Sequence, residues 1–129
     1  MNANESADRI SISEAKVMNI IWDQGPITAK EISMLIEEQF GWKNNTTYTV
    51  ISKLIAKGMV YRKDPGYICS ALISRDEMRR IETRNLIEKM FNGSRKLFFS
   101  SLMEDDEISD EEMKFLKDMI SKNGNMKHS

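Results

Sequence analysis

The hydrophobic pattern of the first half of the chain predicts three amphipathic helices. Ser11 with Glu14 three residues later forms a capping-box signal, so the first helix starts there, and apolar residues then recur every three or four positions up to a Gly-Pro break. Thr28 with Glu31 repeats the signal for a second helix that ends before a glycine. A third helix is predicted over about Asn44–Lys57, with an apolar stripe of Val50, Ile51, Leu54 and Ile55.

After the third helix the apolar pattern changes to short runs rich in β-forming residues. Met59–Lys63 and Tyr67–Leu72 flank the sequence Asp64-Pro65-Gly66, which has strong turn chemistry. These runs predict a β-hairpin. Three helices followed by a hairpin is the order of elements in a winged helix-turn-helix, with the turn at the tip of the wing.

The sequence pattern of the second half of the chain predicts helices throughout. Ser74 and Ser109 are each followed by a glutamate three residues later, and Ser94 caps a helix between these two. The last helix is predicted to end at Asn123-Gly124. The expected fold class is therefore mainly α with a small β-hairpin.

Two parts are expected, a winged-helix DNA-binding domain over residues 1–73 and a helical dimerisation region over residues 74–129. Each helix of the second part has one apolar stripe, which a monomer would leave in water, and a two-fold dimer would cover it. The alternative is that these helices fold back on the first domain in one monomeric core. The residues expected at the dimer interface are Ile81, Ile87, Met90, Phe91, Phe98, Leu102, Leu116, Met119 and Ile120.

Composition places the chain among globular proteins of the cytoplasm. Of its 129 residues 40% are hydrophobic and 30% charged, and no stretch is apolar for the roughly 20 residues of a membrane span. The single Cys69 cannot form an internal disulfide, and the ten methionines fall at core spacings without cysteine or histidine partners, so we expect no metal site and no cofactor. No phosphate loop, dinucleotide fingerprint or nucleophile motif is present, and we expect no enzyme activity.

The distribution of charge is more informative than the net charge of -1. From Lys43 to Lys63 the chain has five cations and no acid, whereas Glu104–Glu112 has seven acids among nine residues. A polyanion could therefore approach only the first of these segments.

The third helix would turn a polar, nearly uncharged face away from its apolar stripe. Short donors and acceptors and methyl groups suit the major groove, and flanking cations suit phosphates. The predicted base readers are Asn45, Thr46, Tyr48, Thr49 and Ser52, and the predicted phosphate contacts are Lys43, Lys53, Lys57, Arg62 and Lys63. Three alternatives stay open: an ordinary solvated face, a winged-helix module that binds a protein partner, and a ligand-gated winged-helix repressor of another family.

The chain resembles the penicillinase repressors of the BlaI/MecI type over nearly its whole length. The resemblance is carried by Ile10-Ser11 with Glu14, the run Val17-Met18-Asn19-Ile20-Ile21-Trp22, Trp42, then Thr46, Thr49, Ile51, Leu54, Lys57 and Gly58, and Ser70-Ala71-Leu72. It implies a homodimer that binds an inverted-repeat DNA operator and represses genes of β-lactam resistance. It also implies release by proteolysis in the dimerisation region, started by a membrane-bound sensor protein that detects β-lactam.

Two departures from relatives of this type bear on the mechanism. The bond that is cut in the family joins Asn and Phe, and the aligned residues here are Ser101 and Leu102, so this candidate cleavage site has different side chains. A related branch of copper-responsive repressors has paired Cys-x-Cys motifs, and none occurs in this chain.

Overall fold

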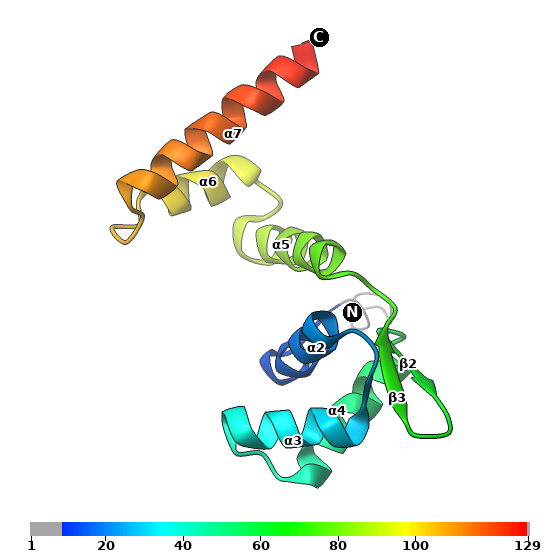
Figure 1. Cartoon of the computed structure of the whole chain (residues 1–129). Coiled ribbons are helices and arrows are strands. Elements are labelled where there is room, and N and C mark those ends of the chain that lie inside the picture. Colours follow the sequence, from blue (N-terminus) through cyan, green and yellow to red (C-terminus); the bar gives the residue numbers. More distant parts are fainter. Residues whose placement is uncertain (1–8, 129) are drawn as a thin grey trace. The chain divides into compact units, whose positions relative to one another are not determined.

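The computed structural model describes the backbone of residues 9–128 and the side chains of residues 9–124. The chain forms two compact units, Met1–Asn85 and Leu86–Ser129, so the division falls inside the helix α5 (Arg75–Phe91). Figure 1 shows the order of the elements. Among the described residues, none of the helices combines the length and the apolar character that crossing a membrane requires.

Three complete helices lie in the first unit, and the first two start at the capping signals of the sequence. In α2 (Ile12–Gln24) the capping box is complete, because Ser11 Oγ accepts a hydrogen bond from the Glu14 amide and Glu14 Oε1 accepts one from the Ser11 amide. α3 (Ala29–Phe40) starts at Thr28, whose hydroxyl caps the Glu31 amide. α4 (Asn44–Ala56) is the predicted third helix, within one residue of the expected end.

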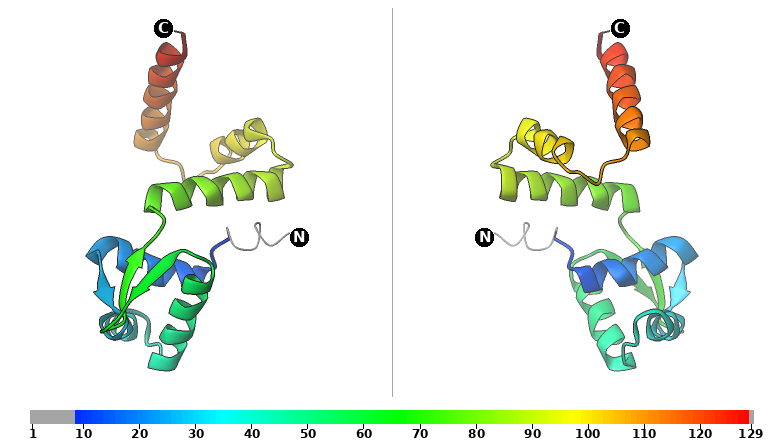
Figure 2. Two further views of the ribbon diagram at one scale, coloured as in Figure 1. Left: turned by 90° about the vertical axis from the view of Figure 1, so that its right-hand side faces the viewer. Right: turned by 90° about the vertical axis from the view of Figure 1, so that its left-hand side faces the viewer.

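The hairpin consists of β2 (Val60–Lys63) and β3 (Ile68–Ala71), joined by the predicted turn. A third strand that the sequence did not predict, β1 (Ile27–Thr28), pairs with β3, so the strand order is β1-β3-β2. The expectation of a two-stranded hairpin was incomplete because two residues are too short to display the alternation that marks a strand. In Figure 1 the hairpin stands at one side of α2, α3 and α4, and in the left view of Figure 2 it faces the viewer.

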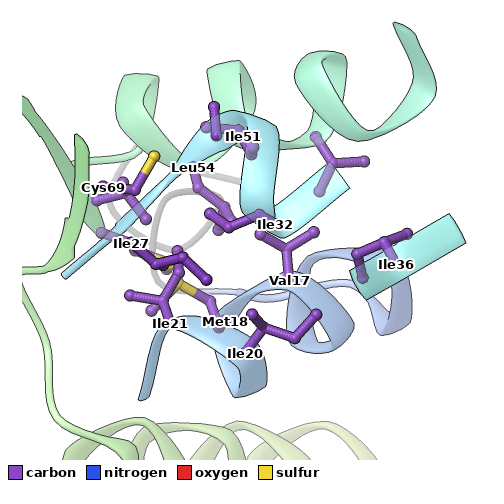
Figure 3. Close-up of a cluster of buried hydrophobic side chains, with 14 of the residues drawn as sticks. Val17, Met18, Ile20, Ile21, Ile27, Ile32, Ile36, Ile51, Leu54 and Cys69 are labelled. Carbon is purple, nitrogen blue, oxygen red and sulfur yellow. The ribbon is translucent and has the colours of Figure 1, made fainter. Parts of the chain in front are cut away.

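One hydrophobic core holds the first unit together. Side chains from α2, α3, α4 and the sheet meet in it, as Figure 3 shows for Met18, Ile32, Ile51, Leu54 and Cys69. All five are fully buried. Burial of several large aliphatic side chains at about 1.5 to 3 kcal/mol each fixes α4 against α2 and α3.

The first part of α5 belongs to the first unit, because Met78 is buried in the same core and Ile81 packs against it. The compact unit therefore extends twelve residues beyond the boundary at residue 73 that the sequence suggested. Ile81, one of the residues expected at a dimer interface, is half-buried against this core. The capping serine at Ser74 marked the start of a helix, and a helix start is not by itself a domain boundary.

The second unit contains the end of α5, then α6 (Arg95–Met103) and α7 (Asp110–His128). Ser94 caps α6, and Ser109 with Glu112 forms a complete capping box for α7. The predicted end of α7 at Asn123-Gly124 is wrong, since the helix continues to His128. A glycine inside a helix costs only about 1 kcal/mol relative to alanine, so this one does not stop it.

Candidate nucleic-acid interface

The packing of α4 decides which of its side chains reach solvent. Thr47, Val50, Ile51 and Leu54 are buried toward α2 and α3. The opposite side is exposed and carries most of the predicted base readers and one predicted phosphate contact, namely Asn45, Thr46, Thr49, Ser52 and Lys53. The structure thus brings these residues together on one face without an acidic side chain.

Hydrogen bonds within α4 set what this face can offer a ligand. Thr49 Oγ1 donates to the Asn45 carbonyl at 2.8 Å, so its methyl group and oxygen lone pairs remain available. Asn45 Oδ1 accepts from the Thr46 amide at 3.1 Å, which leaves the Asn45 amide group as a donor. The face therefore presents a donor, acceptors and methyl groups, the groups that read base edges in the major groove.

A groove of about 440 Å³ runs along this face and brings in residues that the sequence analysis missed. Its other wall is the start of α2, where Ser11 and Ser13 lie across from α4. The lining consists of Ser11, Ser13, Glu14, Asn45, Thr46, Thr49, Val50 and Lys53. Ser13, close to the capping residue Ser11, was the only sequence signal for this wall of the groove. It becomes part of the polar face only because α2 packs against α4.

Tyr48 differs from the other predicted base readers. Its side chain is half-buried, packs against the core and meets the Tyr67 ring edge-on, with ring centroids 5.7 Å apart. The expectation that Tyr48 projects outward like its neighbours is therefore only partly met. The residue lies at the border between the apolar stripe and the polar face, where spacing alone does not decide the direction of a side chain.

The hairpin carries the cations predicted beside its turn. Arg62 stacks on the Tyr67 ring, with its guanidinium carbon 3.5 Å from the ring centroid, and its Nε lies 3.2 Å from an oxygen of Asp64. Lys63 and Lys43 are exposed. The Tyr67 ring thus contacts both Tyr48 of α4 and Arg62 of the hairpin.

The ammonium group of Lys57 is engaged by other residues of the first unit. Its Nζ donates to Glu14 Oε1 at 2.8 Å and to the Arg9 carbonyl at 2.9 Å. The Glu14 side chain is buried and lines the same groove, so the ion pair neutralises its charge beside the polar face. Lys57 thus has pairing partners inside the unit, and its predicted phosphate contact stays a prediction.

Glu14 is held in its ionised form. Burial raises its pKa, but hydrogen bonds from Lys57 and from the Ser11 amide, together with the positive charge of Lys57, outweigh burial, so the pKa lies below its usual value of 4.5. A carboxyl group with a depressed pKa in the folded state contributes stability above its unfolded pKa. That contribution is lost as the pH falls below 4.5 and through the lower folded value.

Replacing Glu14 by glutamine is therefore expected to lower the free energy of unfolding in a pH-dependent way. Glutamine keeps the capping geometry but removes the charge that pairs with Lys57, and the loss at pH 7 should be about 1 to 3 kcal/mol. Urea unfolding of both proteins at pH 7 and pH 3 measures it, and the difference should shrink at pH 3. A difference of equal size at both pH values would contradict the ionised pair.

The predicted dimerisation residues fall into two groups in the second unit. Ile87 is buried, and Phe91, Phe98, Leu102 and Leu116 are half-buried within their own chain. Met90, Met119 and Ile120 are exposed. Further large apolar side chains that the prediction did not include are also exposed in this unit, at Leu86, Leu97, Phe99, Met103 and Phe115.

Three helices, a hairpin wing and an acid-free polar face on the third helix together define a winged helix-turn-helix protein. The family model described as penicillinase repressor matches residues 10–122. The chain therefore belongs to the penicillinase repressor family, as the resemblance implied. This is a family of DNA-binding transcriptional repressors and not of enzymes, which confirms the expectation of no enzyme activity and excludes a repressor of another winged-helix family.

Individual relatives agree with this membership. A penicillinase repressor of Staphylococcus aureus is 26% identical over 121 residues, which cover 92% of this chain and 95% of the relative. The methicillin resistance regulatory protein MecI of Mammaliicoccus sciuri is 29% identical over 115 residues, covering 88% and 94%. The solution structure of the DNA-binding domain of the repressor BlaI is 25% identical with a TM-score of 0.50, and the match covers 55% of this chain and 89% of that one.

Proposed function

We propose that this repressor binds a palindromic DNA operator as a homodimer and places α4 of each subunit in the major groove. The observation that carries the proposal is the exposed face of α4, where Asn45, Thr46 and Thr49 offer hydrogen-bonding and methyl groups and the helix itself carries no acid. The one acid of the groove, Glu14 of α2, is buried and paired with Lys57. Lys43, Lys53, Arg62 and Lys63 surround this face with exposed cations that suit the phosphate backbone.

Support for the dimer comes from the second unit. α7 alone exposes Phe115, Met119 and Ile120 on one side, and such a row of large apolar side chains is normally covered by a partner. A two-fold dimer would offer two copies of α4 to half-sites about 34 Å apart, one turn of DNA. The operator would then be an inverted repeat.

The names of the relatives suggest which genes are controlled. They are called penicillinase repressors and methicillin resistance regulators, and we propose that this chain, acting in the cytoplasm, likewise controls genes of β-lactam resistance. Derepression would follow from a cut in the second unit, triggered by a membrane-bound β-lactam sensor. The candidate bond Ser101-Leu102 lies in the last turn of α6, with Ser101 exposed, so that turn would have to unwind to enter a protease.

The proposal predicts how Lys53→Ala alters DNA binding. Lys53 is the exposed cation on α4 and would contact phosphate, so its loss should weaken binding to the operator and to unrelated duplexes by the same factor. The slope of log affinity against log salt should become shallower by about one unit. Fluorescence anisotropy with both kinds of duplex between 50 and roughly 300 mM salt measures this.

A protein-binding winged helix would give a different result in the same titration. Its affinity for DNA would be weak and insensitive to sequence, and Lys53→Ala would leave the salt slope unchanged. Either result would contradict the proposed contact.

A further inference from the structure

The start of α5 is tied to the end of α2 by a single arginine. Arg75 Nη2 donates to Asp23 Oδ1 at 2.7 Å and to both the carbonyl and the side-chain oxygen of Asn19 at 3.3 Å. Its guanidinium carbon also lies 5.3 Å from the centre of the Trp22 ring. One side chain of α5 thus engages three residues that lie within little more than one turn near the C-terminal end of α2.

A second contact lies two turns further along α5, at the opposite end of α2. Glu82 Oε1 accepts a hydrogen bond from the Ile10 amide at 3.0 Å, just before α2 begins. Between these two points Met78 is buried in the core. The start of α5 is therefore fixed along α2 at both ends, in an antiparallel sense, and this pair of contacts (Arg75 with Asp23 and Asn19, Glu82 with Ile10) is called the α2–α5 clamp below.

The same helix α2 also holds α4. Glu14 of α2 forms the ion pair with Lys57, which follows α4, and α2 packs against α4 through the core. Any change in how α5 sits on α2 would therefore change the direction of α5 relative to the polar face of α4. α5 is one continuous helix from Arg75 to Phe91 and passes from the first unit into the second at Asn85.

The ion pair of the clamp is poorly placed to serve stability. The side chains of Arg75 and Asp23 are 32% and 61% exposed, and ion pairs in contact with water add little to the free energy of unfolding. They do restrict geometry, because a planar guanidinium with several fixed acceptors allows few orientations. A role in orientation fits the contacts better than a role in stability.

We propose that Arg75 and Glu82 are positioning residues that set the distance between the two copies of α4 in the dimer, and thereby the half-site spacing that the repressor accepts. The inference rests on the proposed function, since it needs a dimer and a palindrome. The inference goes beyond the proposed function because it assigns the choice of half-site spacing to the α2–α5 clamp, which lies away from the polar face of α4. Neither residue needs to touch DNA.

The test compares the wild-type protein with Arg75→Ala/Glu82→Ala on DNA of varied spacing. The probe is a pair of inverted half-sites, recovered by the wild-type protein from a random-sequence pool, with the spacer changed one base pair at a time. The wild-type protein should bind one spacing with about tenfold or more higher affinity than the others. For the double variant this ratio of affinities should be less than about threefold. Affinity for a single half-site should stay the same.

A distance measurement on the free protein provides a second readout. A spin label at Glu38→Cys, which is exposed on α3, reports the separation of the two first units by pulsed electron resonance. Cys69 is buried and burial raises the pKa of its thiol, so it should not take the label. The clamp variant should give a broader distance distribution than the wild type, and Arg80→Ala, an exposed arginine on the same helix, should not.

Two results would overturn the inference. The first is a clamp variant with an unchanged spacing preference and an unchanged distance distribution. The second is an equal loss of affinity at every spacing with an unchanged distribution, which would mean that the clamp only supports the fold. A wild-type protein that is monomeric by sedimentation and shows no spacing preference would instead overturn the proposed function.

Discussion

In the proposed homodimer, the double variant Met119→Asp/Ile120→Asp is expected to separate the subunits and to weaken operator binding by about 10²- to 10⁴-fold. Both side chains are exposed on α7, and placing two carboxylates in an apolar interface leaves their charges without partners. Once the subunits are separate, the second half-site is no longer bound intramolecularly. Sedimentation and binding to the full palindrome measure the two effects.

The same variant should bind a single half-site as tightly as the wild-type protein, because the first unit is untouched. Ser121→Asp is the matched control, since Ser121 is exposed on the opposite side of α7 and should tolerate a carboxylate. A double variant that remains dimeric would contradict the assignment of this side of α7 to the dimer. Equal losses on half-site and palindrome would contradict the avidity argument.

Thr46→Ala is expected to reduce discrimination between operator and unrelated DNA by about 1 to 3 kcal/mol, which is roughly 5- to 150-fold. Thr46 is exposed on α4 and lines the groove, and alanine removes its hydroxyl while keeping the helix. Competition binding with operator and random duplexes at one salt concentration measures the ratio. The salt slope should not change.

The comparison with Lys53→Ala separates reading of bases from attraction to phosphate. Thr46→Ala should lower only the affinity for the operator, whereas Lys53→Ala should lower both affinities together. Equal losses on operator and random DNA for Thr46→Ala would show that this position does not read bases.

Local signals in the sequence predicted most of the fold because each has a local physical cause. Ser11 with Glu14 and Ser109 with Glu112 satisfy amides of their own first turns, so these helix starts depend on four neighbouring residues only. The turn at Asp64-Pro65-Gly66 depends on backbone preferences within the turn itself. Such features are visible in a sequence before any packing is known.

The errors concern features that depend on residues far away in the chain. β1 forms because Ile27 pairs with Cys69 in the sheet, and no residue near Ile27 in the sequence indicates this pairing. The pairing of Lys57 with Glu14 was not predicted because the two residues lie 43 positions apart in the chain. The clamp residue Arg75 was not singled out at all, since its acceptors are on α2.

The proposed DNA recognition depends most on the polar face of α4 lying against base edges. NMR of the repressor bound to its palindrome can test this directly through magnetisation transfer from the methyl groups of Thr46 and Thr49. We expect contacts from these methyls to major-groove base protons, including thymine methyls. Contacts to deoxyribose protons alone, or none while another element of the first unit contacts the bases, would contradict it.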